Sequence, residues 1–312
     1  MRLLLVLFLA TPMLSAAEAA RSNVLIIKSG SASVYNRIVT ATKQRIDLIC
    51  QQTRSKCRRP LISVDSIRSN KLRGIAQNKK WDLIITVGTK AARQLNSFNL
   101  QTPTLYSLIP SHSFPGIRNS SHSRQKSAIY IDQPIRRQLQ LIKSAMPGRK
   151  KVGVFLGKYS GVGKQRLQQI MRRMGLEPVV TQVAPNDVGN SLDTLFSKSS
   201  VLLALPDPTI YNKQTVLKVL LSSYRHRVPV IGYSSAFVKS GATAAVYSTP
   251  RDIGHHIGDE VAKYFAKDKG RLSPPAFPRY FTINTNKSVT NSLKLRIPSR
   301  KTILSRIRKA EQ

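Results

Sequence analysis

The chain has 312 residues, of which 41% are hydrophobic and 21% are charged, and this balance excludes an intrinsically disordered protein. Lysine and arginine number 51 against 14 aspartate and glutamate residues, a formal net charge of +37. Inside a cell such a charge would favour nucleic acid, but the basic residues are scattered along the chain instead of gathered in one arm. A solvated basic surface is the simpler interpretation, and we expect no nucleic-acid partner.

The first residues predict an exported protein. Arg2 precedes an apolar run over residues 3–14, and Ala17 and Ala19 give the spacing of small residues that signal peptidase accepts. The run is about 12 residues, shorter than the ~20 that a membrane-spanning helix needs, which disfavours a retained anchor. We expect residues 1–19 to be a cleavable signal peptide, with Ala17 as the alternative cleavage point, and a mature chain in the periplasm.

Two cysteines, Cys50 and Cys57, flank the sequence QQTRSK. In an oxidising compartment they can close a small disulfide loop. A metal site would need a further histidine or a second cysteine pair nearby. The sequence therefore predicts a structural disulfide between Cys50 and Cys57.

In the first half of the chain, short β-branched runs alternate with amphipathic stretches, which is the pattern of a parallel sheet covered by helices. The expected strands are 23–28, 61–64, 82–87, 104–108 and 128–131. Helices are expected from residue 32 to about Cys50, over 71–79 and over 90–98.

The second half repeats the same alternation. The expected strands are 151–156, 178–183, 201–205, 228–231, 242–247 and 280–284. The expected helices are 134–146, 163–174, 188–196, 209–226, 235–239, 252–265 and 287–293. Two such sets without a flexible linker predict an α/β protein with two Rossmann-like parallel-sheet lobes and a cleft between them.

Several stretches together resemble a known family. They are DLIITVGTKAA (82–92), AIYIDQPIRRQLQLIKSAMPGRKKVGVFLG (128–157), YSSAFVKSGATAAVYSTPRDIGHHIGDEVAKYF (233–265) and PPAFPRYFTINTNKSVTNSLKLRIP (274–298). Their order and spacing resemble ABC-transporter substrate-binding proteins of the type I periplasmic fold, in particular members that bind amino acids or aromatic ligands. Lys294 is a departure, because the family usually has glycine there.

The resemblance implies a function and a lobe assignment. Lobe 1 would contain residues 20–133 and 249–285, and lobe 2 residues 134–248 and 286–312. The implied protein is a monomer without cofactor that captures a small amino-acid-like or anionic ligand and delivers it to a membrane permease. Some members of the family serve instead as ligand-loaded partners of membrane sensors, and the sequence does not separate these alternatives.

Polar and aromatic residues follow the expected strands, and the carboxyl ends of parallel strands meet at one edge of a sheet, where ligands bind. The candidate ligand-binding residues are Ser29, Ser31, Tyr35, Gly88, Thr89, Tyr106 and Ser107 in lobe 1, and Tyr159, Ser160, Asp207, Tyr211, Tyr233 and Ser234 in lobe 2.

Each candidate has a ligand role and a structural alternative. Ser29, Thr89 and nearby amides would hold a ligand carboxylate, while Asp207 would bind an ammonium or hydroxyl group. The tyrosines would stack on an apolar ligand side chain. The alternatives are an N-cap at Asp207 for a helix near Thr209, turn or capping roles for Ser29 and Thr89, and core packing for each tyrosine.

The sequence gives little support to catalysis or metal binding. GKYSGVGK (157–164) lacks the spacing of a phosphate-binding loop. His255, His256 and Asp259 are expected on a solvated helix face, because no third ligand follows at a metal-binding spacing. No G-x-S-x-G motif is present. A secreted hydrolase and a basic envelope protein without ligand are therefore the less favoured alternatives.

Overall fold

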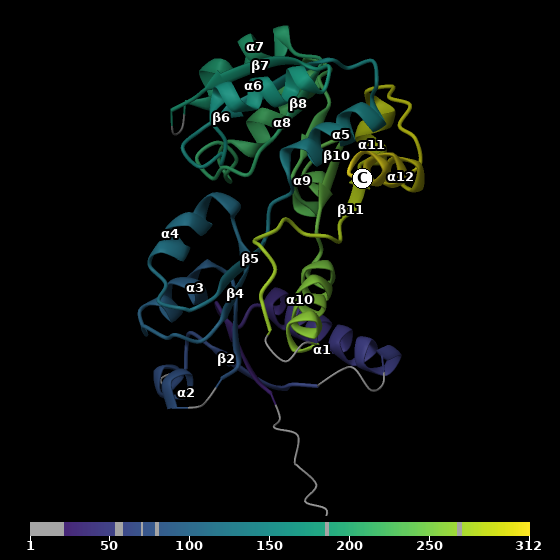
Figure 1. The fold of residues 1–312 in the computed structure, drawn as a ribbon. Helices are drawn as coiled ribbons and strands as arrows, with labels where there is room; N and C mark the ends of the chain where they lie inside the picture. Colours follow the sequence, from purple (N-terminus) through teal and green to yellow (C-terminus); the bar gives the residue numbers. More distant parts are fainter. Residues whose placement is uncertain (1–21, 54–58, 70, 79–80, 185–186, 267–269) are drawn as a thin grey trace, which may run out of the picture.

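The computed structural model describes residues 22–53, 59–69, 71–78, 81–184, 187–266 and 270–312. Figure 1 shows two α/β lobes, one above the other, joined by crossing segments of the chain. The expected signal peptide, residues 1–19, lies outside the described residues. In the part of the chain that is described, no helix combines the length and apolarity needed to cross a membrane.

Lobe 1 is built on a parallel five-stranded sheet of order β2-β1-β3-β4-β5. Its strands are β1 (Asn23–Lys28), β2 (Leu61–Ser66), β3 (Leu83–Val87), β4 (Thr104–Ile109) and β5 (Lys126–Tyr130). Because successive side chains of a strand point to opposite faces, Val24 and Ile26 enter one core cluster while Leu25 and Ile27 enter another.

Helices cover both faces of this sheet. They are α1 (Ser33–Thr53) and α10 (Pro250–Phe265) on one face, and α2 (Leu72–Asn78), α3 (Thr89–Asn96) and α4 (Phe114–Asn119) on the other. Helices α1 and α10 pack closely because Gly254 has no side chain: a Cβ there would lie 2.6 Å from the Ile38 carbonyl oxygen. Cys50, on α1, is buried and disulfide-bonded. Cys57 lies outside the described residues, so the Cys50–Cys57 pairing stays a prediction.

Lobe 2 contains a six-stranded sheet of order β11-β10-β9-β8-β6-β7. Its strands are β6 (Lys151–Leu156), β7 (Glu177–Gln182), β8 (Val201–Leu203), β9 (Val230–Gly232), β10 (Ala244–Tyr247) and β11 (Thr282–Thr285). All neighbours are parallel except β10 and β11. Helices α5 (Ile135–Ala145), α6 (Lys164–Arg173) and α12 (Arg300–Ala310) cover one face, and α7 (Val188–Lys198), α8 (Val216–Arg225) and α9 (Ser235–Lys239) the other.

Strand β11 corrects the lobe boundary that the resemblance implies. Residues 249–285 were expected in lobe 1, but β11 pairs antiparallel with β10, with Ile283 opposite Val246. Both side chains belong to the lobe 2 core. The chain therefore returns to lobe 2 before Thr282.

The helix expected over 209–226 begins only at Val216. Polar side chains hold the preceding residues in turns: the Asp207 carboxylate accepts from the Thr209 amide, and the Asn212 side-chain oxygen accepts from the amides of Gln214 and Thr215. Such local bonds compete with helix formation.

Short helix α11 (Lys287–Ser292) ends two residues before Lys294, the position where the resemblance implies glycine. Lys294 has a left-handed backbone, with φ of 53°. Its amide donates to the Asn291 carbonyl and the Leu295 amide to the Thr290 carbonyl, the bonding pattern of a helix end that favours glycine. Lys294 therefore adopts the backbone conformation that glycine favours at a helix end.

The chain crosses between the lobes at three places: from β5 to α5, from β10 to α10, and from α10 to β11 (Figure 1). A hydrogen-bond relay joins these crossings. The side-chain amide of Gln133 donates to the Ser248 hydroxyl at 2.9 Å, and this hydroxyl donates to the Tyr280 carbonyl at 2.6 Å. We call these three residues the hinge relay.

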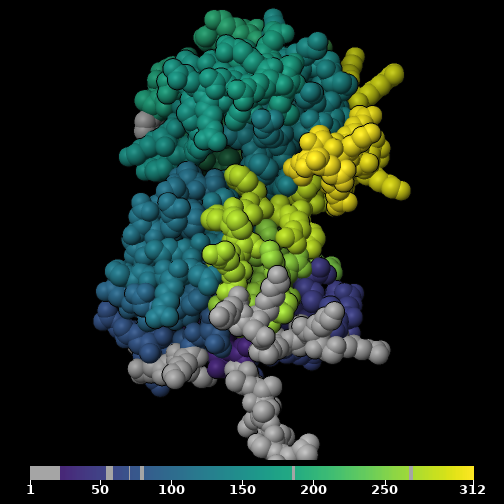
Figure 2. Space-filling model, viewed as in Figure 1, coloured from purple at the N-terminus to yellow at the C-terminus, as the bar shows by residue number. Residues whose placement is uncertain are grey.

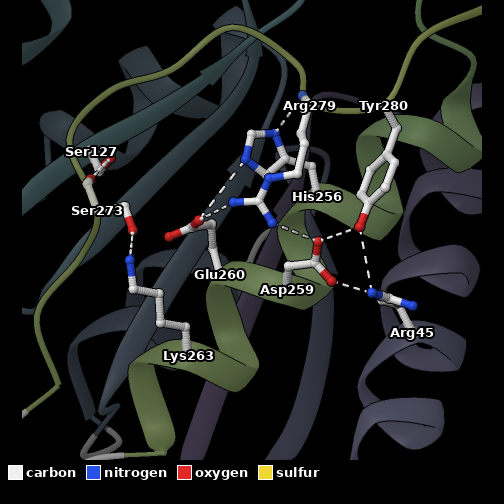
Figure 3. A network of polar contacts seen from close by, with 9 residues as sticks. All are labelled: Arg45, Ser127, His256, Asp259, Glu260, Lys263, Ser273, Arg279 and Tyr280. Carbon is white, nitrogen blue, oxygen red and sulfur yellow. Dashed lines mark hydrogen bonds and ion pairs between the residues drawn. The ribbon is translucent and has the colours of Figure 1, made fainter. Parts of the chain in front are cut away.

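A polar network fixes the third crossing to helix α10 (Figure 3). The Asp259 carboxylate accepts from Arg45 Nε at 2.7 Å, from the Tyr280 hydroxyl at 2.7 Å and from Arg279 at 3.1 Å. The Arg279 guanidinium also lies 3.6 Å from Glu260. This face of α10 was expected to be solvated, but it packs against α1 and the crossing segment.

His256 belongs to the same buried face. Its Nδ1 accepts from the Arg279 amide, and its Nε2 lies 3.9 Å from Glu260. Burial and the nearby Arg279 charge lower the pKa of His256, which favours the neutral ring. Within the described ranges, no group of three or more His, Cys, Asp or Glu side chains is arranged to hold a metal ion.

Candidate ligand-binding cleft

A cleft of about 880 Å³ lies between the two lobes. Its lining comes from lobe 1, from lobe 2 and from the crossing segments, and the space-filling view shows a hollow between the upper and lower lobes (Figure 2). On one side the lobes approach each other closely. An ideal Cβ placed on Gly161 of lobe 2 would lie only 3.5 Å from His112 Nδ1 of lobe 1. The volume is in the range of sites for small organic molecules.

All the lobe 2 residues expected from the sequence line this cleft: Tyr159, Ser160, Asp207, Tyr211, Tyr233 and Ser234. They follow β6, β8 and β9 at the carboxyl edge of the sheet. Strands β6 and β8 are neighbours at the point where the strand order reverses, which is where parallel sheets open to ligands.

Asp207 is 1% exposed and lies at the base of this edge. Its Oδ2 accepts from the Tyr159 amide at 2.8 Å and the Ser160 hydroxyl at 2.9 Å, while its Oδ1 accepts from the amide and hydroxyl of Thr209. The carboxylate is thus engaged within the chain. The geometry supports the structural alternative, in which Asp207 caps the following turn and joins two loops, and gives no support to pairing with a ligand ammonium group.

The aromatic side chains of lobe 2 form a cluster beside Asp207. The Tyr211 and Tyr233 ring centroids lie 6.1 Å apart, and Tyr233 lies 5.1 Å from Phe237. The Tyr211 hydroxyl is buried and has no hydrogen-bond partner among the described residues. Burial raises the pKa of both Tyr211 and Tyr233. Both hydroxyls therefore stay protonated, and that of Tyr211 has a hydrogen bond still to make.

Gln138, which the sequence did not single out, is a second group of this kind. It is 2% exposed, belongs to α5 and lines the cleft. Its side-chain nitrogen donates to the Gln133 carbonyl at 3.2 Å, whereas its Oε1 has no partner in the described part of the chain. A buried acceptor without a partner costs free energy until a ligand or water satisfies it.

Two cations of the cleft lining have no polar contact with a described side chain or carbonyl. Arg136 and Arg166 are exposed in its lining, and neither makes an ion pair or hydrogen bond with a described residue. Asp132, by contrast, accepts from the amide and hydroxyl of Ser111. Strand-end reasoning missed both arginines because they lie on helices α5 and α6.

On the lobe 1 side, none of the residues expected from the sequence is among the described residues that line the cleft. The Ser29 hydroxyl accepts from the Ala91 amide at 2.9 Å, and a Cβ at Gly88 would lie 2.5 Å from this hydroxyl and 3.4 Å from the Tyr35 ring. Ser31 accepts from Arg68 at 3.4 Å. Thr89 is the first residue of α3. Ser29 has the capping role that was its alternative.

Tyr106 and Ser107 are fully buried and are not among the described residues that line this cleft, so the geometry favours their structural alternative. The Tyr106 hydroxyl lies 2.7 Å from both Asn96 Oδ1 and the Ser121 hydroxyl. The Ser107 hydroxyl donates to the Thr86 carbonyl. They precede the end of β4 and face its two covered sides, whereas Ser111 and His112, just beyond the strand, reach the cleft.

The family model for ABC transporter substrate binding proteins matches residues 66–304. The chain belongs to this family. Its members are non-enzymatic solute-binding proteins that deliver small molecules to a membrane permease and work in the periplasm or outside the cell. The match confirms the resemblance seen in the sequence. No curated protein matches this substrate-binding protein in a sequence comparison.

Solved structures confirm the fold of the substrate-binding protein. A ligand-free, open substrate binding protein with adhesive properties from Clostridium difficile is 17% identical, with a TM-score of 0.68 over 90% of this chain and 97% of that one. An ABC domain in complex with L-Trp from Streptococcus pneumonia is 17% identical, with a TM-score of 0.58 over 92% and 98%. A periplasmic ribose ABC transporter protein from Conexibacter woesei is 15% identical, with a TM-score of 0.53 over 88% and 96%.

Proposed function

We propose that this substrate-binding protein captures a small anionic or amino-acid-like ligand with a carboxylate and an apolar body, and presents it to a permease. The observation that carries the proposal is the cleft of about 880 Å³. It contains two buried polar atoms without a described partner, Gln138 Oε1 and the Tyr211 hydroxyl, beside unpaired Arg136 and Arg166.

Each part of the lining suits one part of such a ligand. The guanidinium groups of Arg136 and Arg166 suit a carboxylate. The rings of Tyr159, Tyr233 and Phe277 suit an apolar body, which gains by leaving water. Gln138 Oε1 accepts a hydrogen bond from a ligand amine or hydroxyl, which removes the cost of leaving this atom unpaired.

Lobe 1 completes the site when the hinge closes. Ser29, Ser31, Gly88 and Thr89 follow the carboxyl ends of strands β1 and β3. We propose that Ser111 and His112 contact the ligand first, and that closure brings the Ser31 and Thr89 hydroxyls toward it. The closed form is the state that the permease receives.

Calorimetry with a panel of amino acids, aromatic acids and small dicarboxylates tests the proposal. A bound carboxylate should lose about tenfold in affinity when it is replaced by its neutral amide, or when Arg136 or Arg166 is changed to glutamine. Arg173→Gln is the matched control, because Arg173 is an exposed arginine of α6 outside the cleft lining. If no compound of the panel gave a binding signal or raised the unfolding temperature, the result would contradict ligand capture in this cleft.

We also propose that the chain acts in the periplasm as a monomer after removal of residues 1–19. The mass of the mature protein and its N-terminal sequence test the cleavage after Ala19, and light scattering tests the monomer. An intact Arg2 in the exported protein would contradict the cleavage.

A further inference from the structure

Helix α8 presents an apolar stripe to solvent. Leu217, Leu221 and Tyr224 are 57%, 59% and 53% exposed. Their spacing places them on one side of the helix, along roughly 10 Å at 1.5 Å per residue. The opposite side, with Val219 and Leu220, packs into the core of lobe 2.

Cations flank this stripe at both ends. Lys213, in the turn before the helix, and Lys218, in its first turn, are exposed, as are Arg225, its last residue, and Arg227 just beyond it. The sequence from residue 213 to 227 contains no acidic residue. The neighbouring carboxylate, Asp193 of α7, is bound to His226 at 3.0 Å. We call the three apolar side chains and these four cations the α8 surface.

The charge of the chain decides between possible occupants of the α8 surface. A second copy would bring another formal +37, so like charges would oppose self-association. An acidic partner protein would call for cations confined to the α8 surface, whereas basic residues are also spread along the rest of the chain. A spread of this kind suits an extended anionic surface, which attracts each cation within a Debye length.

We propose that the α8 surface docks the protein on a membrane that contains anionic phospholipids. Leucine and tyrosine side chains between flanking lysines and arginines have the composition of helices that lie in the membrane interface. The turns before α8 contribute Pro208 and Tyr211 to the cleft, so docking holds the ligand site next to the bilayer. This inference does not depend on which ligand the cleft takes.

Sedimentation with protein-free vesicles tests the proposal. The probes are phosphatidylcholine vesicles with and without an equal part of phosphatidylglycerol, at ionic strengths of about 0.15 M and about 0.5 M, where the Debye length falls from about 8 Å to a few Å. Scattered charges lose their attraction at the higher salt, whereas inserted apolar side chains do not. Wild type should therefore keep measurable binding to the anionic vesicles at about 0.5 M.

The decisive variant is Leu217→Ser with Leu221→Ser and Tyr224→Ser. At the higher salt it should lose at least about tenfold in partitioning to anionic vesicles. The matched control changes three exposed apolar residues of lobe 1, Leu48, Leu61 and Val64, to serine and should bind like wild type. Thermal unfolding and calorimetry with a cleft ligand verify that both variants keep the fold and the cleft.

A Tyr224→Trp variant gives an independent readout. Its fluorescence should shift to shorter wavelength with anionic vesicles and stay unchanged with pure phosphatidylcholine, above a constant contribution from buried Trp81. The proposal is overturned if the triple serine variant binds as wild type does, because scattered charge then suffices. It is also overturned if the α8 surface is needed for binding to solubilised membrane proteins but not to lipid vesicles.

Discussion

The two lobes share one strand order around their first strand, β2-β1-β3-β4-β5 and β7-β6-β8-β9-β10, but their ligand edges differ. In lobe 1 the loops after β1 and β3 close on each other through Ser29 and Gly88. In lobe 2 the loops after β6 and β8 join through Asp207 and still leave Tyr159 and Tyr211 in the cleft. The same topology thus delivers polar residues to both edges, and local hydrogen bonds decide which of them a ligand reaches.

Gly88→Ala tests the closed edge of lobe 1 and has the largest expected effect. Gly88 has φ of 98° and ψ of 158°, a conformation that only glycine adopts readily, and a Cβ would overlap the Ser29 hydroxyl. We expect the free energy of unfolding to fall by about 3 kcal/mol in denaturant titrations. Gly116→Ala is the control, since a Cβ at Gly116 of α4 meets nothing within 4 Å. Equal stability of the two variants would contradict the tight contact between Gly88 and the Ser29 hydroxyl.

Asp207→Asn tests the corresponding junction of lobe 2. The amide nitrogen of asparagine would face donors that now bind a carboxylate oxygen. We expect a loss of about 2 kcal/mol in unfolding free energy. Asp187→Asn, at the exposed start of α7, should change stability by less than about 0.5 kcal/mol. If Asp207→Asn abolished ligand binding while stability stayed unchanged, the carboxylate would instead contact the ligand.

Tyr106→Phe tests a core tyrosine of lobe 1 whose hydroxyl is hydrogen-bonded within the lobe. The change leaves Asn96 and Ser121 without this contact, so we expect a loss of about 1.5 kcal/mol. Calorimetry should give an unchanged ligand affinity, because Tyr106 is fully buried away from the cleft lining. A weaker affinity at unchanged stability would place Tyr106 in the site after all.

Tyr211→Phe is the counterpart in lobe 2 and has the smallest expected effect on stability. The lost hydroxyl is buried and has no described partner. The free energy of unfolding, measured by thermal unfolding, should therefore fall by only a few tenths of a kcal/mol or rise. Ligand affinity should fall about tenfold if the hydroxyl bonds the ligand. A destabilisation as large as that of Tyr106→Phe would assign the hydroxyl to the fold.

The sequence predicts the two-lobed architecture well because buried parallel strands consist of nearly continuous apolar runs. The strand expected at 151–156 is β6 residue for residue, and the one at 82–87 differs from β3 by a single position. The helix α12 escaped notice because it buries mainly Ile303 and Ile307 among many charged side chains. The pairing of β11 with β10 escaped because it depends on tertiary contacts between distant segments.

The candidate site is predictable only in part. The rule that ligands meet strand ends leads to Tyr159, Tyr211 and Tyr233 in the lining of the cleft. It does not lead to Gln138, whose unpaired oxygen becomes visible only when its neighbours are placed around it. Nor does it separate Ser29, bound to a helix amide, from a serine that is free to bind a ligand.

The hinge relay of Gln133, Ser248 and the Tyr280 carbonyl has a practical consequence. Because hydrogen bonds link the three crossings, the two lobes should move relative to each other about a single axis. One interlobe distance is then enough to follow this motion. Cys50 is disulfide-bonded, so cysteines introduced on the outer faces of α4 and α6 offer sites for a pair of fluorophores. The efficiency of energy transfer between the two fluorophores would then report ligand binding by the protein.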